Sequence, residues 1–224
     1  MRDPFLCVGP TILNVSGGRA STYMLRRHLD AHGGRLPRDT HAVFCNTGTE
    51  REETLRFVAD CAERWGVAIV WIERDGSQPA GARFRETDYE HASRAGEPFA
   101  ELITERKYVP NAVTRFCTQA LKIETARDYE LDALVRRVIA DRTHGETSVV
   151  TFGPRRMPLR AAALPISNGG DWAVLLTLTD LTEVQRVDQV RRDFLSNVSH
   201  ELRTPLAAIR ALVETLDDGV DEED

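Results

Sequence analysis

Short apolar runs alternate with longer amphipathic segments in the first half of the chain. The runs are five or six residues long and rich in β-branched and aromatic side chains, which favours buried strands. The longer segments repeat apolar residues at helical spacing, and glycines follow their last residues. This pattern predicts strands at Thr11–Val15, His41–Cys45 and Val67–Ile72, with helices at Arg19–His32 and Glu50–Trp65. Alternation of this kind predicts an α/β fold with a parallel sheet covered on both faces.

The second half has a different pattern. A helix is predicted at Asp128–Asp141, followed by an antiparallel meander of three strands at Thr147–Phe152, Met157–Ile166 and Trp172–Thr179. A long helix then runs from Glu183 to about Arg203 and on towards Leu216, with a kink expected near Pro205. We expect the helix at 128–141 to cover one face of the small sheet, because three strands alone leave an apolar face open.

The change of pattern predicts two modules that join near residues 125–130. The expected division is a domain at 1–127, a partial sensor-like sheet at 128–182, a long helix at 183–216 and an acidic, disordered tail at 217–224. We expect the long helix to seek a partner, because its apolar residues recur every three or four positions and would otherwise face water.

Charge and cysteine usage narrow the classes of function. The chain of 224 residues has a net charge of −6, and six acidic residues lie in the tail at 217–224. The rest is neutral, which argues against nucleic acid or an anionic membrane as a partner. The longest uncharged apolar run, Trp172–Thr179, is far shorter than the roughly 20 residues of a membrane span. Without a signal peptide pattern or paired cysteines, we expect a cytoplasmic protein with reduced thiols and no metal site.

A glycine pair marks the junction between the first strand and the first helix. In the segment Ser16-Gly17-Gly18-Arg19-Ala20-Ser21, glycines let the backbone approach an anion, and the amides of the helix start point towards it. The same residues also fit a structural strand-to-helix turn capped by serine. Spacing alone does not separate these two interpretations.

This segment resembles the Ser-Gly-Gly-x-x-Ser loop of the PP-loop adenine-nucleotide family, which includes the phosphoadenosine phosphosulfate reductases. Two later segments, 44–50 and 115–123, resemble further motifs of that family in the same order. The resemblance covers about residues 10–125 and implies a HUP-like sheet that binds ATP or another adenine nucleotide. It implies nucleotide binding by Ser16, Gly17, Gly18, Arg19 and Ser21, and a candidate substrate site at Cys117 and Lys122.

The chain departs from this family at three points. Arg19 stands where many members have Lys or Asp, no Cys-Cys pair or iron–sulfur pattern is present, and the resemblance ends after Ile123. A single cysteine such as Cys117 is also compatible with a small buried apolar residue.

A second candidate site lies in the long helix, at residues 194–206. Apolar side chains at 194, 198, 202 and 206 share one face of a helix, and His200 lies off that face. Glu201 supplies a carboxylate that can fix the imidazole tautomer and accept its proton, and Thr204 follows His200 by one helical turn. Here a histidine can act as a nucleophile.

Residues 194–206 resemble the H-box of sensor histidine kinases, and residues 129–219 are most similar to sensor kinases of the phosphate-regulon type. The resemblance implies that His200 is the phosphoacceptor, Glu201 the assisting base and Thr204 a residue of the phosphatase reaction. It implies Mg²⁺-ATP as phosphoryl donor, a response regulator as partner and a homodimer through the long helix. The three strands resemble the end of a PAS domain, and Asp180-Leu181-Thr182 resembles its link to the helix.

Both resemblances are partial, so the chain has the pattern of a chimera of two truncated modules. The leading interpretation is a phosphoacceptor segment of a two-component phosphorelay behind a PP-loop-like domain. Whether it acts as a transferase stays open, because the Asn-rich and Gly-rich boxes with which a kinase binds ATP are not found in it. The alternatives are an enzyme acting on an adenylylated or sulfated nucleotide, and an inactive chimera.

Overall fold

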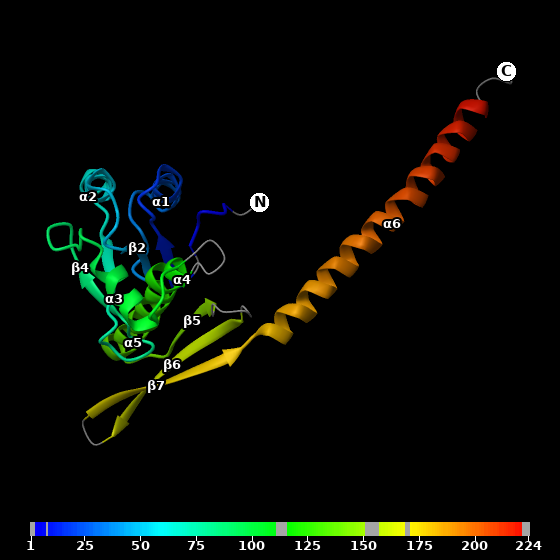
Figure 1. Cartoon of the computed structure of the whole chain (residues 1–224). Helices are drawn as coiled ribbons and strands as arrows, with labels where there is room; N and C mark the ends of the chain where they lie inside the picture. The colour runs from blue at the N-terminus through cyan, green and yellow to red at the C-terminus, as the bar shows by residue number, and fades with distance from the viewer. Residues whose placement is uncertain (1–2, 8, 111–115, 151–156, 169–170, 221–224) are drawn as a thin grey trace. The chain divides into compact units, whose positions relative to one another are not determined.

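The computed structural model describes residues 3–7, 9–110, 116–150, 157–168 and 171–220 (Figure 1). The chain divides into two compact units, Met1–Thr179 and Asp180–Asp224. Each unit is described by itself below.

The larger sheet of the first unit has four strands in the order β1-β2-β3-β4. Strands β1 (Thr11–Asn14), β2 (Thr40–Asn46) and β3 (Ile69–Arg74) are parallel, with Ile12 paired to His41 and Phe44 to Trp71. This confirms the predicted parallel sheet. An edge strand that the pattern did not predict, β4 (Phe84–Thr87), pairs antiparallel with β3.

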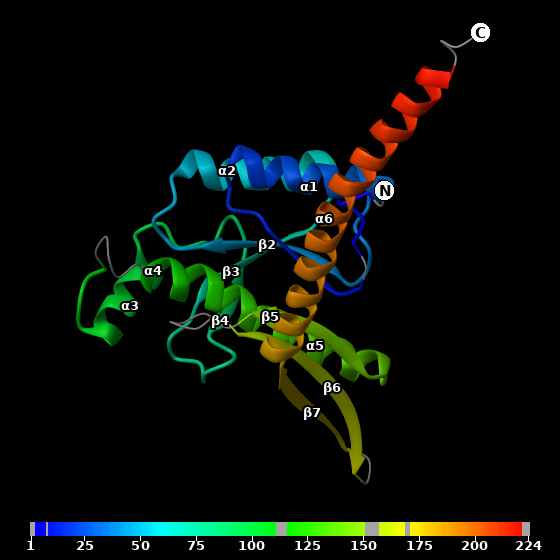
Figure 2. The ribbon, with the colours of Figure 1, turned by 90° about the vertical axis from the view of Figure 1, so that its right-hand side faces the viewer.

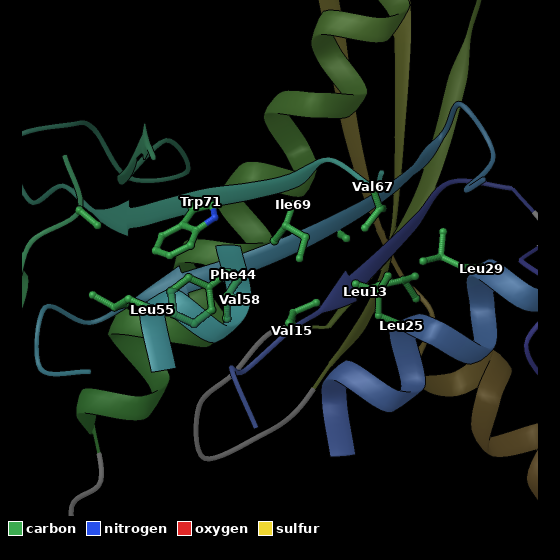
Figure 3. Packing of buried hydrophobic residues seen from close by; sticks show 12 residues of the cluster. Leu13, Val15, Leu25, Leu29, Phe44, Leu55, Val58, Val67, Ile69 and Trp71 are labelled. Carbon is green, nitrogen blue, oxygen red and sulfur yellow. The ribbon is translucent and has the colours of Figure 1, made fainter. Parts of the chain in front are cut away.

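Helices cover both faces of this sheet. Helices α1 (Arg19–Ala31) and α2 (Glu52–Trp65) lie on one face (Figure 2), where their apolar residues pack against alternate residues of the strands. Figure 3 shows Leu25 of α1 near Leu13 and Val58 of α2 near Phe44. The opposite face, which includes Val43 and Ile72, packs on α5 (Thr125–Asp141). Successive strand side chains point to opposite faces, so each strand contributes to two cores.

Three helical segments precede or lead into α5, and the sequence pattern did not predict them. Helix α3 (Glu97–Arg106) is separate. The short α4 (Phe116–Thr118) continues through a π-helical segment, η1 (Gln119–Glu124), into α5. Leu102, Ala120 and Leu121 form a small apolar core between α3 and η1.

The second sheet has three strands in the order β5-β6-β7, as predicted for the meander. They are β5 (Gly145–Val150), β6 (Pro158–Asn168) and β7 (Asp171–Asp180), and β5 runs antiparallel to β6. Leu134 and Val138 of α5 pack on Ala161 and Ala163 of β6, which confirms that this helix covers the sheet. Residues 151–152 of the predicted first strand lie outside the described residues.

The structure differs from the predicted junction near residues 125–130. Helix α5 passes through this region and packs on both sheets, so the sheets belong to one compact unit that ends at Thr179. Thr125 and Asp128 are buried there. The sequence pattern placed a boundary at a change of strand type, but the shared helix joins the two sheets.

The second unit is helix α6 (Thr182–Val220). Asp180 caps its start, since its Oδ1 accepts hydrogen bonds from the backbone N–H of Thr182 at 2.8 Å and from the Thr182 hydroxyl at 2.6 Å. Pro205 lies inside this helix, which is continuous on both sides of it. It also includes residues 217–220 of the tail predicted to be disordered; 221–224 lie outside the described residues. No helix in the described part of the chain is both long and apolar enough to cross a membrane.

Candidate functional site

The glycine-containing loop follows β1 directly. The Val15 N–H donates to the Val43 carbonyl at 2.8 Å, so parallel pairing continues up to the residue before Ser16. Gly18 is the N-cap of α1 and has no side chain to bond the first amides of the helix. The loop therefore leads from strand β1 into a helix whose first N–H groups receive no side-chain cap.

Gly17 is required by packing as well as by backbone conformation. Its φ is 74°, in the left-handed region that favours glycine. A Cβ added there would lie 2.4 Å from Cγ2 of Thr54 in α2. The bare backbone of Gly17 thus faces α2, and a larger residue would disturb the packing of that helix whether or not an anion binds the loop.

The two serine hydroxyls of the loop bond to each other. Ser21 Oγ accepts from the Ser16 N–H at 3.0 Å, lies 2.9 Å from Ser16 Oγ and donates to the Gly18 carbonyl at 3.0 Å. Ser21 therefore holds the loop in shape, while Ser16 is exposed. Arg19 is exposed in the first turn of α1.

A cavity of about 590 Å³ lies beside β1. Strand β1 forms one wall, η1 and the first turns of α5 form another, and Ser148 of β5 contributes to the lining. Of the sequence-predicted site residues, Ser16 and Lys122 line this cavity. The full lining comprises Pro10, Thr11, Ile12, Asn14, Val15, Ser16, Cys45, Thr118, Lys122, Ile123, Ala126, Arg127, Glu130 and Ser148.

Lys122, in the segment 115–123, contacts the segment 44–50. Its Nζ donates to Oε1 of Glu50 at 3.0 Å, and its backbone carbonyl accepts a hydrogen bond from Sγ of Cys45 at 3.4 Å. Glu50 also accepts from the Thr47 hydroxyl at 3.2 Å. Segments from two separate parts of the sequence, 44–50 and 115–123, thus meet beside the carboxyl end of β2.

Neither Cys45 nor Cys117, the two cysteines at this end of the sheet, is placed as a reactive thiol. Cys117 is half-buried and packs in the apolar core between α3 and η1, outside the cavity lining. Cys45 lines the cavity, but burial raises the pKa of its thiol to about 12. Such a thiol stays protonated at neutral pH and is a poor nucleophile. The candidate role of Cys117 as a substrate-site thiol gains no support from this geometry.

Glu130 is a cavity residue that the sequence reasoning missed. It is half-buried, and its Oε1 accepts a hydrogen bond from the Thr147 hydroxyl at 2.7 Å. Burial raises the pKa of its carboxyl, and the bond from Thr147 lowers it by less. The spacing in the sequence could have indicated Glu130, because it lies eight residues after Lys122 and therefore on the same face of a helix. Residues 118, 122, 126 and 130, spaced by four, all line the cavity.

The histidine site lies on α6. The backbone positions of Phe194, Val198, Leu202 and Leu206 form one stripe, and His200 falls about 180° round the helix from its centre. Phe194 is 63% exposed and Leu206 is 61% exposed. Glu201 is exposed next to His200, whereas the side chains of His200 and Thr204 lie outside the described residues.

Among the residues that the structure describes, no group of three or more His, Cys, Asp or Glu side chains is arranged to hold a metal ion.

Comparisons with known proteins bear on the C-terminal part. Residues 190–224 match the family model of the His Kinase A (phospho-acceptor) domain. The Sensor protein SrrB of Staphylococcus aureus strains NCTC 8325 / PS 47 and COL is 42% identical over 55 residues. That stretch is 25% of this chain and only 9% of the length of each relative. No solved structure matches the chain significantly. Residues 190–224, with His200 among them, are therefore similar to the phospho-acceptor domain of histidine kinases.

Proposed function

We propose that this chain takes part in a two-component phosphorelay in which His200 is the phosphoacceptor. The observation that carries the proposal is the match of residues 190–224 to the phospho-acceptor domain, with His200 in the middle of α6. The adjacent carboxylate of Glu201 is exposed to solvent.

The proposed reaction moves one phosphoryl group twice. An imidazole nitrogen of His200 attacks the γ-phosphorus of Mg²⁺-ATP, the bond from that phosphorus to the β,γ-bridging oxygen breaks, and ADP leaves. Glu201 accepts the proton that the imidazole loses. A carboxylate oxygen of a response-regulator aspartate then attacks the phosphorus and the P–N bond breaks, which returns His200 to its starting state.

The test adds a second, complete sensor kinase that phosphorylates this chain from ATP. A complete sensor kinase with the same H-box type is incubated with labelled ATP and this chain, and label that is acid-labile and alkali-stable is measured. Wild type should take label, and His200→Gln should take none. Glu201→Ala should slow labelling by about 100-fold, since a positioned base contributes at least about that factor.

The matched control is His91→Gln, because His91 is an exposed histidine in the other unit. It should be labelled like wild type, and this chain with ATP alone serves as the blank. Persistent label on the His200→Gln protein would contradict the assignment of the phosphoacceptor.

A second candidate function is adenine-nucleotide binding in the cavity beside β1. The observation that favours it is that Ser16 and Lys122, from two segments that resemble PP-loop motifs, line one cavity of about 590 Å³. The helix start next to Ser16 has no side-chain cap, and its free amides favour an anion. We propose that the phosphates lie at this end, near the Lys122 ammonium.

Titration calorimetry with ATP and with adenosine phosphosulfate tests this second function. Lys122→Gln removes the charge and should weaken binding by about tenfold or more, as expected for a charge-assisted hydrogen bond. The matched control is Lys107→Gln, since Lys107 is exposed and lies outside the cavity lining. Absence of binding of both nucleotides to wild type at millimolar concentration would contradict the proposal. Stronger binding of adenosine phosphosulfate would favour the enzyme alternative.

A further inference from the structure

Among the residues that the structure describes, one charged group of the cavity beside β1 has no charged partner. Of its lining residues, Lys122 pairs with Glu50 at 3.0 Å and Arg127 pairs with Asp128 at 2.7 Å. Glu130 makes its hydrogen bond to Thr147, and it has no cation within ion-pair distance among the described residues. A half-buried carboxylate in this setting keeps free acceptor capacity, because a carboxylate can accept about four hydrogen bonds.

The cavity has two chemically different ends. Ser16 and Lys122 lie by the carboxyl ends of β1 and β2. Glu130 also lines a smaller cavity next to it, together with Thr11 and His41, which lie by the amino ends of these strands. From Lys122 to Glu130 the chain advances eight residues, and the six of these that belong to α5 rise about 9 Å.

Small and apolar side chains line the cavity between these two ends. Ala126 lies midway between Lys122 and Glu130 on the same helical row, and its small side chain leaves room along the helix. Ile12 and Val15 of β1 line the same stretch. A ligand suited to this shape carries an anionic group at one end, a flat or apolar middle and a hydrogen-bond donor at the other end.

We propose that Glu130 is a specificity-determining residue that accepts a hydrogen bond from the exocyclic amine of a purine base bound in this cavity. The proposal rests on the nucleotide binding proposed above, since it takes the phosphates to lie near Ser16 and Lys122. An amine at the purine C6 position donates to a carboxylate, whereas a carbonyl at that position would face its negative charge. The site therefore favours adenine over a 6-oxopurine.

The second sheet contributes to this end of the cavity. Thr147 of β5 holds Oε1 of Glu130, and Ser148 lines the cavity beside it. Base selection thus depends on a strand outside the region that resembles the PP-loop family.

The test compares ATP with inosine triphosphate by calorimetry on the full chain. Wild type should bind ATP about tenfold or more tightly, the effect of one hydrogen bond to a charged group. Glu130→Gln should weaken ATP binding, because the charged acceptor is lost. It should also reduce or reverse the preference for ATP over inosine triphosphate, because the new amide can donate to the C6 carbonyl of inosine triphosphate. This variant can still accept the Thr147 hydrogen bond, and thermal unfolding checks that it is folded.

The matched control is Glu146→Gln. Glu146 is an exposed glutamate next to Thr147 in β5, and its substitution should keep the wild-type preference for ATP. If wild type binds ATP but shows no preference, or if Glu130→Gln keeps the preference, Glu130 does not read the base and nucleotide binding still stands. If wild type binds neither nucleotide, the proposed nucleotide site fails and the role of Glu130 fails with it.

Discussion

At the scale of single residues, the buried carboxylate of Glu73 holds Asn46, which lies in the segment 44–50. Glu73 is 1% exposed and accepts hydrogen bonds from Asn46, from the N–H and hydroxyl of Ser93, and from Arg85. Burial alone would raise the pKa of Glu73, but the bonds from Arg85, Ser93 and Asn46 outweigh it and the pKa is lowered. Asn46 is also fully buried, and its Oδ1 accepts from the Gly48 N–H. This asparagine therefore shapes the turn after β2 from inside the protein.

Glu73→Gln should lower the free energy of unfolding by about 2–3 kcal/mol at pH 7, because Arg85 loses its charged partner and the buried amide cannot accept all five hydrogen bonds that the carboxylate accepts. A carboxylate with a lowered pKa in the folded state stabilises the protein above its ordinary pKa of 4.5. This contribution is lost as the pH falls through the folded-state pKa.

Urea unfolding at pH 7 and at pH 3.5 measures the difference between Glu73→Gln and wild type. The difference should shrink at the lower pH, and Glu90→Gln, at an exposed glutamate, should change little at either pH. An equal loss of stability at both values would show that the charge of Glu73 does not stabilise the fold.

At the scale of elements, α5 acts as a shared wall. Ala126, Tyr129 and Ala133 pack against the parallel sheet, while Leu134 and Val138 pack against β6. The start of β5 approaches α5 closely, since a Cβ at Gly145 would lie 2.8 Å from Cδ1 of Leu134. Because one rigid helix belongs to both cores, the cavity between β1, α5 and β5 has walls from both sheets.

At the scale of the whole molecule, α6 carries an exposed apolar stripe. With the half-buried Val198 between Phe194 and Leu202, apolar residues recur every three or four positions along one face of the helix. The exposed members of this stripe are Val184, Val187, Val190, Phe194, Leu202, Leu206 and Ile209. This spacing is typical of a helix that packs on another helix along a narrow seam. The stripe and the match to the phospho-acceptor domain together support the proposed homodimer.

Sedimentation equilibrium of wild type should give about twice the chain mass of 25.1 kDa. Phe194→Glu places a charge in the stripe of both helices and should raise the dimer dissociation constant by at least about 100-fold, given the free energy of burying two aromatic side chains. Ser196→Glu, on the opposite side of α6, should leave the dimer intact. A monomeric wild type, or a Phe194→Glu protein that stays dimeric, would contradict association through this stripe.

Residues 75–124 show where sequence patterns fall short. Strand β4 has four residues, of which two are charged, and it pairs only because β3 offers an open edge. The helical segments α3, α4 and η1 are short, and their packing against each other depends on contacts between residues distant in sequence. Periodicity is informative only where one long face of an element is buried.

The sequence by itself determined the parallel strands β1–β3, the helices α1 and α2, the three-stranded second sheet and the long helix α6, because each has a continuous apolar pattern of its own. The similarity of residues 190–224 to the phospho-acceptor domain is likewise a property of the sequence alone. Only the tertiary structure decided that α5 joins both sheets, and that Glu130 and Ser148 share a cavity with Ser16 and Lys122. These relations arise from packing between distant segments, which local periodicity does not encode.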